Sequence, residues 1–436
     1  MLQVELTKDE IKSIRKEIKK KNSIFKDKRY LDSLFLPSNI IGRRKQAKKI
    51  LEYFESLQHG LLVPVISIFG RSGSGKSTVV KFVCKNTDDL ISYAFVNIRK
   101  AKTVFGCANM ILAELGAEPL KSFNGLTRVI ESIGKRIEDF LLSNNKRFFV
   151  LVLDEYDVIF YDKRGNPSDF MYKLLTLEEN LREKNLWLCV VTISNNALVD
   201  YNLDDRVKSR MGSSEVFFDP YSEADVLSIL MDRARKSFVS IPKKEVLSLC
   251  AKISADNHGD ARRAIDLLRI AAESSNGREI TTSDVKTAYD IFQKDRLKSI
   301  VTEVSHHQRN VIGAVCFNLL YSNSNSTTTS ETYERYCKMV GKEKSLSYRR
   351  IVDLLVELVN AGLLSSRTIS RGRKGYGTEY TLLMPLDLVG MTLDEKWWES
   401  QLGHKKTEEL LDGLQKNMRT RKKFFPSRYQ NLFKGM

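Results

Sequence analysis

The feature that most constrains the fold is the segment GRSGSGKS, which spans residues 70–77. It follows the apolar run Val63–Phe69, which predicts a buried strand, and it precedes an amphipathic helix expected to start near Ser77. The spacing G-x-x-x-x-G-K-[ST] in that setting is typical of a loop whose backbone N–H groups surround phosphate oxygens. The chain is therefore expected to bind a nucleoside triphosphate.

Each residue type in this loop has a physical task. Glycines let the backbone curl around phosphate oxygens, Lys76 reaches the β- and γ-phosphates, and the Ser77 hydroxyl can bind Mg²⁺. The residues predicted to hold the nucleotide phosphates are Gly70, Ser72, Gly73, Ser74, Gly75, Lys76, Ser77 and Thr78.

An acidic strand end is the second expected part of the site. Residues 148–153 are six apolar residues in succession, and Asp154 and Glu155 follow them directly. In parallel sheets ligands bind beyond the carboxyl ends of the strands, so both carboxylates are expected beside the phosphate loop. Asp154 is predicted to lie near the metal and Glu155 to polarise the attacking water. A helix-capping acidic pair is the alternative interpretation.

Polar and basic residues further along the chain are candidates for the same site. Asn195 follows the apolar strand 186–193, where an amide can bond the γ-phosphate and water, although asparagine is also a common turn residue. Arg206 and Arg210 lie four apart, on one face if helical. Asp204 and Asp205 could simply pair with them, or one arginine could serve a neighbouring subunit's phosphate.

Arg262 and Arg263 stand in the expected first turn of a helix, after Gly259 and Asp260. The helix dipole disfavours cations there, which indicates that an anion lies nearby. A nucleotide phosphate fits this requirement, and Arg262 is the better placed of the two arginines.

Composition sets the class of partner. Basic residues outnumber acidic ones by 17, and a polyanion is the natural partner of such a chain. The excess is concentrated late in the chain, with 13 basic and 7 acidic residues over 296–384. The six scattered cysteines include no C-x-x-C pair, so neither a disulfide framework nor a zinc site is expected. No apolar run is long enough to cross a bilayer, so the protein is expected to be soluble and intracellular without a membrane partner.

Patterning divides the chain into parts. Strands alternate with helices as far as Pro220, which predicts an α/β domain with a parallel sheet covered on both faces. Helices alone follow, and then three helices precede a hairpin. The predicted domains are a charged extension (1–38), the α/β domain (39–219), an all-helical domain (220–296), a helix-and-hairpin domain (297–395) and a basic tail (396–436).

Six segments together resemble one known family. In order they are GRSGSGKST, VLVLDEYD, TISN, DDRVKSRMG, FFDPYSEADVLSIL and GDARRAIDLLR. They look like the AAA+ ATPase initiator family, which comprises archaeal replication initiators related to the eukaryotic origin recognition complex and its cell-division-control loader. The likeness runs from about Ile40 to Met384.

The resemblance implies a role for each matching position. Asn195 matches the first sensor, Arg262 the second, and Arg210 the arginine finger, with Arg206 as the second choice. Residues 221–296 match the lid that closes over the nucleotide, with Tyr221 at its start. Ile40 and Ile41 are expected near the adenine. Arg44 departs from the family pattern, in which this position usually carries an acid. This departure leaves the adenine-side contacts open. ATP or ADP and Mg²⁺ are the implied ligands.

The end of the chain has a winged-helix layout. The helix expected over 345–362 carries an apolar stripe, with Tyr348, Arg349 and Arg350 on its opposite face. In this layout the third helix enters the major groove and the hairpin, or wing, reaches a neighbouring groove or the phosphates. The predicted wing residues are Arg371, Arg373, Lys374 and Tyr376, and the alternative for them is a solvated loop.

The family also carries a DNA-contacting insertion after the second strand. Arg99, Lys100 and Lys102 lie where it should begin, although a solvated turn explains them nearly as well. The tail after Trp397 lies outside the resemblance, and its basic run 419–423 is either a DNA clamp or a solubilising end.

The function expected from these features is an ATP-dependent replication initiator that binds double-stranded origin DNA and helps to load the replicative helicase. Slow ATP hydrolysis would act as a switch, and paralogous initiators are further expected partners. The expected location is the cytoplasm, on the nucleoid, or the nucleus in a eukaryote. One rival is a DNA-binding regulator in which ATP is structural. Another is a signalling ATPase whose winged helix binds protein.

Overall fold

The structure is a computed structural model of the 436-residue chain. It describes residues 8–59, 61, 63–101, 103–162, 164–198, 201, 203–211, 214–256, 259–322, 325–370 and 376–420. The chain divides into two compact units, residues 1–285 and 286–436, and each is described by itself. None of the helices in the described ranges is long and apolar enough to cross a membrane.

A five-stranded parallel sheet forms the core of the first unit. Its spatial order is β2-β3-β4-β1-β5. Neighbouring strands pair in parallel throughout, and Phe69 near the end of β1, for example, lies opposite Ser194 at the end of β4. The strands are β1 (Val65–Gly70), β2 (Ser92–Asn97), β3 (Phe148–Asp154), β4 (Trp187–Ser194) and β5 (Glu215–Phe218).

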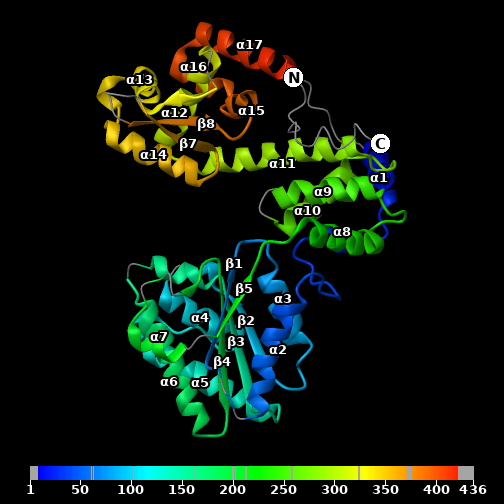
Figure 1. Ribbon diagram of the computed structural model, residues 1–436, viewed down its shortest axis with the longest axis vertical. Helices are drawn as coiled ribbons and strands as arrows, with labels where there is room; N and C mark the ends of the chain where they lie inside the picture. The colour runs from blue at the N-terminus through cyan, green and yellow to red at the C-terminus, as the bar shows by residue number, and fades with distance from the viewer. Residues whose placement is uncertain are drawn as a thin grey trace. The chain divides into compact units, whose positions relative to one another are not determined.

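Helices cover both faces of this sheet because its central strands are apolar on both sides. Figure 1 shows α2 and α3 on one face and α4, α5 and α6 on the other, and each set of helices packs on its own buried cluster. The helices are α2 (Arg44–Gln58), α3 (Lys76–Lys85), α4 (Val104–Glu114), α5 (Gly125–Ser143), α6 (Pro167–Arg182) and α7 (Asp205–Met211). Short 3-10 helices are η3 (Ile98–Lys100), η4 (Ser122–Asn124) and η5 (Tyr156–Tyr161).

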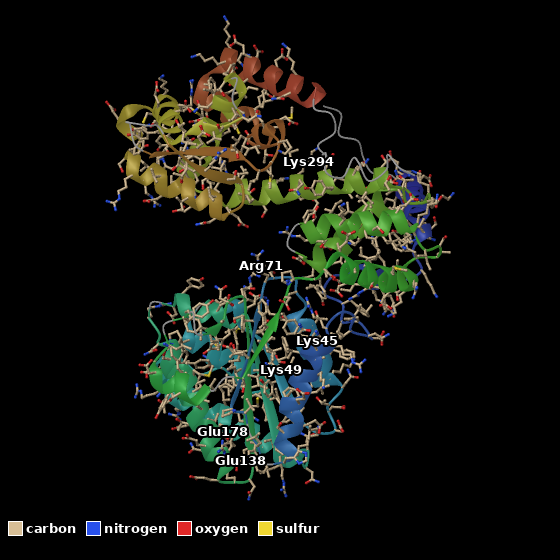
Figure 2. The ribbon with its side chains drawn as sticks, in the orientation of Figure 1. Lys45, Lys49, Arg71, Glu138, Glu178 and Lys294 are labelled. Carbon is tan, nitrogen blue, oxygen red and sulfur yellow. The ribbon has the colours of Figure 1, made fainter. Side chains whose placement is uncertain are left out.

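The fifth strand, β5, has no counterpart among the strands expected from the sequence. It is only four residues long and lies at the sheet edge, so its pattern is too short to stand out. Lys49 of α2, labelled in Figure 2, donates to the Glu215 carbonyl at 2.5 Å. This contact fixes one end of β5 against α2.

A helical lid completes the first unit. Its helices are α8 (Glu223–Ser237), α9 (Lys244–Asp256), α10 (Ala261–Ser274) and the start of α11 (Thr282–Glu303). A capping box formed by Ser222 and Asp225 starts α8 where the strand region ends.

The N-terminal segment packs on the lid. It consists of α1 (Lys8–Lys21), η1 (Asn22–Ile24) and η2 (Lys28–Leu31). Phe25 stacks on Phe238, with ring centroids 5.3 Å apart. Arg233 of α8 donates to the carbonyls of Tyr30 and Phe35, each at 3.1 Å. Residues 24–35 of the predicted charged extension are therefore tied to the lid.

The second unit is a winged helix. After the end of α11 come α12 (His306–Tyr321), β6 (Thr327–Thr328), α13 (Thr329–Val340), η7 (Lys342–Lys344) and α14 (Tyr348–Asn360). The hairpin strands β7 (Leu364–Ser370) and β8 (Tyr376–Leu382) follow, and antiparallel pairing gives the order β6-β8-β7. The predicted fold class, a parallel α/β domain with a helical lid and a winged helix, is confirmed.

Three more helices close the second unit (Figure 1). They are α15 (Leu386–Thr392), α16 (Glu395–Leu402) and α17 (His404–Thr420). Trp398, Leu410 and Leu414 are buried in the same core as α12 and α14. As far as residue 420, the segment predicted to be a basic tail is thus part of the domain, because its apolar residues recur at helical spacing among the charges. The predicted domain boundaries otherwise stay predictions.

Candidate functional site

The phosphate loop lies between β1 and α3, at the carboxyl edge of the sheet, where Figure 2 labels Arg71. Gly73 and Gly75 have φ angles of 80° and 92°, which side-chain-bearing residues rarely adopt. A Cβ at Gly73 would lie 2.1 Å from the Asp260 carboxyl carbon, and one at Gly75 would lie 2.4 Å from the Tyr221 hydroxyl. Both glycines are therefore favoured by backbone shape, and a side chain at either position would force Asp260 or Tyr221 to shift.

Lys76 is buried at the first position of α3. Its Nζ donates to the loop's own carbonyls, at Gly70 and, at 2.9 Å, at Arg71. Burial lowers the pKa of Lys76 to about 8, and the nearby Asp154 carboxylate partly opposes this shift. An anion in the loop would compensate the buried ammonium group, as the predicted role of Lys76 requires.

Ser77 and Asp154 meet although they lie on different elements. The Ser77 hydroxyl donates to Asp154 Oδ1 at 2.9 Å, since α3 starts beside the end of β3. Burial raises the pKa of Asp154, while the Ser77 hydrogen bond lowers it. Hard oxygen donors of this kind suit Mg²⁺, which binds few protein groups and takes its other ligands from phosphates and water. These two residues fit the predicted metal position.

Glu155 occupies an unusual backbone conformation, with a φ of 58°. Its carboxylate accepts from Arg99 Nη1 at 3.5 Å, because β2 and β3 are neighbours and both end here. Arg99 thus lies beside the predicted general base rather than apart from the nucleotide site. Lys100 is exposed at the end of η3, and Lys102 lies outside the described residues.

Asn195 lies beyond the end of β4, and its amide donates to Asp157 Oδ2 at 3.2 Å. Asp157 is a residue of η5 that no sequence motif singled out, and its other oxygen, Oδ1, is buried without a hydrogen-bond partner in the described part of the chain. The sequence feature that could have pointed to Asp157 was its position three residues after Asp154. Asp157 also lines the cavity described below.

Arg262 reaches the phosphate loop from the lid. Its Nη2 donates to the Ser72 hydroxyl at 2.9 Å, and Asp260 caps the start of α10 by accepting from the Arg262 backbone N–H. The predicted proximity of Arg262 to the phosphates agrees with this geometry. Both arginines also lie 3.9 Å from an Asp260 carboxylate oxygen, and for Arg263 no contact with the phosphate loop is found among the described residues.

Arg206 and Arg210 both lie on α7. Arg206 forms an ion pair with Asp204, with Nη2 2.8 Å from Oδ2, and its hydrogen bonds lower the pKa of Asp204 to about 2. Arg206 is therefore engaged by the aspartate that the sequence offered as the alternative partner. The side chain of Arg210 lies outside the described residues.

One cavity of about 440 Å³ is lined by the phosphate loop, the acidic end of β3, Asn195 and Arg262. Ile40 and Ile41 line it, as predicted for the adenine side, and so do Thr78 and Tyr221. Several residues of the N-terminal segment between positions 33 and 37 also line it, which the sequence did not indicate. The predicted residues on its wall are Ile40, Ile41, Ser72, Gly73, Gly75, Lys76, Ser77, Thr78, Asp154, Glu155, Asn195, Tyr221 and Arg262. A cavity lined by the phosphate loop and an apolar end has the chemistry that a nucleotide requires.

The predicted DNA-contacting residues belong to the second unit's α14 and hairpin. Tyr348, 44% exposed, and Arg349 lie in the first turn of α14, while Arg350 is within 3.7 Å of Asp353 and 3.5 Å of Glu357. Arg371, Arg373 and Lys374 lie outside the described residues, as does the side chain of Tyr376 at the start of β8.

Family models match three consecutive stretches of the chain. They are the ATPase family associated with various cellular activities (residues 66–217), the Cdc6 AAA+ ATPase-type lid domain (227–290) and the CDC6 C-terminal winged helix domain (299–391). These stretches contain the sheet, the lid and the winged helix described above.

Curated relatives cover most of the chain. It is 31% identical over 389 residues to ORC1-type DNA replication protein 1 of Sulfolobus acidocaldarius, covering 86% of this chain and 94% of the relative. It is 30% identical over 396 residues to the protein of the same name from Methanothermobacter thermautotrophicus, covering 88% and 98%.

Solved structures give the same likeness. The Aeropyrum pernix ORC1 protein in complex with DNA is 28% identical, with a TM-score of 0.69 over 86% of this chain and 97% of that one. Cdc6p from Pyrobaculum aerophilum, 20% identical with a TM-score of 0.52, shares the fold over 87% and 100%.

Proposed function

Because the chain belongs to the family of ORC1-type DNA replication proteins, we propose that it is an ATP-regulated initiator that binds origin DNA and helps to load the replicative helicase. Membership of the AAA+ ATPase family supports ATPase activity in general. Origin recognition, helicase recruitment and the switch are the parts that this proposal adds.

The observation that carries the proposal is the convergence of Lys76, the Ser77–Asp154 pair, Glu155 and Arg262 on one cavity. Lys76 would hold the β- and γ-phosphates, while Ser77 and Asp154 would hold Mg²⁺. When bound between these residues and the phosphates, Mg²⁺ would supply positive charge that neutralises the phosphate oxygens. Glu155 accepts a proton from the attacking water, and Asn195 orients that water.

Arg262 supplies the link from nucleotide to lid. It comes from α10 and bonds the phosphate loop at Ser72, so its guanidinium can also follow the γ-phosphate. When the phosphate leaves, that attraction is lost and the lid is held less tightly. Hydrolysis would then act as a slow timer, since a switch needs long-lived states rather than rapid turnover.

DNA binding is assigned to the winged helix. Exposed Tyr348 and Arg349 in the first turn of α14 would meet base edges, and the basic hairpin would meet phosphates. The similar Aeropyrum pernix ORC1 protein was solved in complex with DNA, which supports the same ligand here. Paralogous initiators and the nucleoid belong to the same proposal.

The deciding experiment maps the chain on its own genome. Peaks at replication origins are expected, and they should weaken in a strain that carries the combined changes Arg371→Ala, Arg373→Ala and Lys374→Ala. Peaks confined to promoters would show a transcription regulator instead. A purified chain without DNA affinity at any salt concentration would indicate a winged helix that binds protein.

A further inference from the structure

Arg43 is a buried cation that the proposed site does not yet use. It precedes α2 and is 4% exposed. Its Nε donates to the Ser74 carbonyl of the phosphate loop at 2.9 Å. Its Nη2 donates to the Asp219 carbonyl at 2.5 Å, in the segment that joins β5 to α8. One guanidinium therefore bridges the phosphate loop and the connection to the lid.

Tyr221 connects Arg43 to the segment of the lid that leads into α10. The Arg43 guanidinium lies 3.8 Å from the centroid of the Tyr221 ring, a distance at which a cation is attracted to the ring face. A Cβ at Gly259 would lie 2.4 Å from the Tyr221 carbonyl oxygen, so no side chain fits between them. Gly259 leads directly into the start of α10, which carries Arg262.

Gly42, the residue before Arg43, packs closely against the first turn of α8, the first helix of the lid. Gly42 has a φ of 72°, and a Cβ there would lie 2.8 Å from Asp225 Oδ1. Asp225 belongs to the capping box that starts α8. The segment 42–43 is thus held between the phosphate loop and the first turn of the lid.

The charge of Arg43 is compensated by dipoles. No carboxylate among the described residues lies within 4.0 Å of its guanidinium, which instead faces two carbonyls and two aromatic rings, Tyr221 and Phe218. Burying a cation without an anionic partner carries a desolvation cost. A polyanion in the adjoining loop would reduce that cost, so Arg43 favours the phosphate-filled state.

The peptide that Arg43 bonds also faces the phosphate position. In a trans peptide the Ser74 carbonyl and the Gly75 N–H point in opposite directions. A charged donor on the carbonyl polarises that peptide and strengthens its N–H as a donor. Gly75 forms part of the cavity wall, where the N–H groups of the loop are expected to hold phosphate oxygens.

From this geometry we infer that Arg43 is a positioning residue that couples phosphate binding to the lid: it strengthens the Gly75 N–H toward phosphate and ties the loop to Asp219 and Tyr221. This inference rests on the proposed function, in which nucleotide state sets the lid. Arg43 touches no reacting atom, so its effect appears in nucleotide affinity and in lid position.

The test uses the full-length chain with Cys337→Ser, because Cys337 is the one native cysteine of the six that is not buried. Labels are placed at Lys85→Cys on α3 and Lys244→Cys on α9, both exposed positions of the first unit. The distance between the labels and the affinity are measured with Mg²⁺ and ATPγS. Arg43→Gln and Arg43→Lys are compared with Arg44→Gln, a matched control on the exposed neighbour.

Wild type and Arg44→Gln are expected to change label distance on binding. Arg43→Lys keeps the charge but not the two-carbonyl fork, so its affinity should fall about tenfold. At saturating ATPγS its distance change should be less than half that of wild type. Arg43→Gln should lose more of the ATPγS affinity and more of the distance change. If the glutamine variant is less stable than wild type, the comparison rests on Arg43→Lys.

Full distance change with wild-type affinity in both Arg43 variants would overturn the inference and leave the proposed switch standing. A wild-type chain that binds ATPγS with no distance change would refute the switch, and the coupling with it. The two failures are therefore distinguishable from the wild-type measurement alone.

Discussion

Ser77 and Asp154 lie 77 residues apart in sequence and share a hydrogen bond, whereas Arg349 makes no hydrogen bond or ion pair among the described residues of the second unit. The nucleotide site is built from side chains that already hold one another in place. In the predicted DNA face, by contrast, the described side chains of Tyr348 and Arg349 are exposed in the first turn of α14. Chemistry on a small ligand benefits from fixed geometry, while binding a long polyanion depends mainly on the number of free cations.

The largest effect should come from the predicted general base. Glu155→Gln removes the predicted general base but keeps its shape, so ATP hydrolysis should fall about 10²- to 10⁴-fold. Nucleotide affinity should change little, because the Glu155 carboxylate pairs with Arg99 and is not among the groups proposed to hold phosphate. Single-turnover hydrolysis and ATPγS titration measure the two quantities. Unchanged hydrolysis would remove Glu155 from the mechanism and weaken the contrast between the units.

Lys76→Ala comes next in expected size. The ammonium group supplies charge-assisted hydrogen bonds to phosphate, so triphosphate affinity should fall about hundredfold. DNA affinity measured without nucleotide should stay at the wild-type value, because the two sites lie in different units. Equal loss of both affinities would mean that the variant is unfolded or that the units act as one, and a melting curve separates these explanations.

A smaller effect is expected at the exposed face. Arg349→Ala should weaken DNA binding about tenfold and relax the sequence preference at the base it contacts, as expected for the loss of a base-edge contact. Lys405→Ala on α17 removes the same charge from an exposed position outside the predicted DNA face and serves as the matched control. Equal losses in the two variants would indicate that net charge, and not the helix face, governs binding.

The smallest predicted effect is the uptake of protons when ATP binds. In the chain without nucleotide the pKa of Lys76 is about 8, so at pH 8.5 more than half of its side chains are neutral. Phosphate favours the ammonium form and raises that pKa, so ATP binding should take up protons, more at pH 9 than at pH 7. Calorimetry in buffers of different ionisation enthalpy measures the uptake. Lys76→Arg, which keeps its proton, should abolish it, and uptake that persists in that variant would point to another group.

The parts of the site that could be predicted from sequence are those whose signal is local. The phosphate loop, the acidic end of β3 and the first turn of α10 each occupy a few consecutive residues with a clear pattern. The role of Arg43 could not be found this way, because it depends on a contact with the Asp219 carbonyl, 176 residues away. Arg99 has a basic sequence context, and only the pairing of β2 with β3 places it beside Glu155.

The same reasoning applies to the fold. Long apolar strands and amphipathic helices were predictable, since burial requires their periodicity. The strand β5 was too short for a pattern, and α16 and α17 carry so many charges that they resemble a soluble tail. Their buried residues are few, with Trp398, Leu410 and Leu414 the main ones, and only the packing shows how much they cover.

The helices α16 and α17 also bear on the stability of the winged-helix core. The winged-helix family model ends at residue 391, yet Trp398 is fully buried in the core and Trp397 lies where a side chain at Gly313 would have to be. Loss of either side chain would leave a void, and a Trp→Ala change in a core costs about 3–5 kcal/mol, so the stability of the second unit depends on residues beyond the end of the family model.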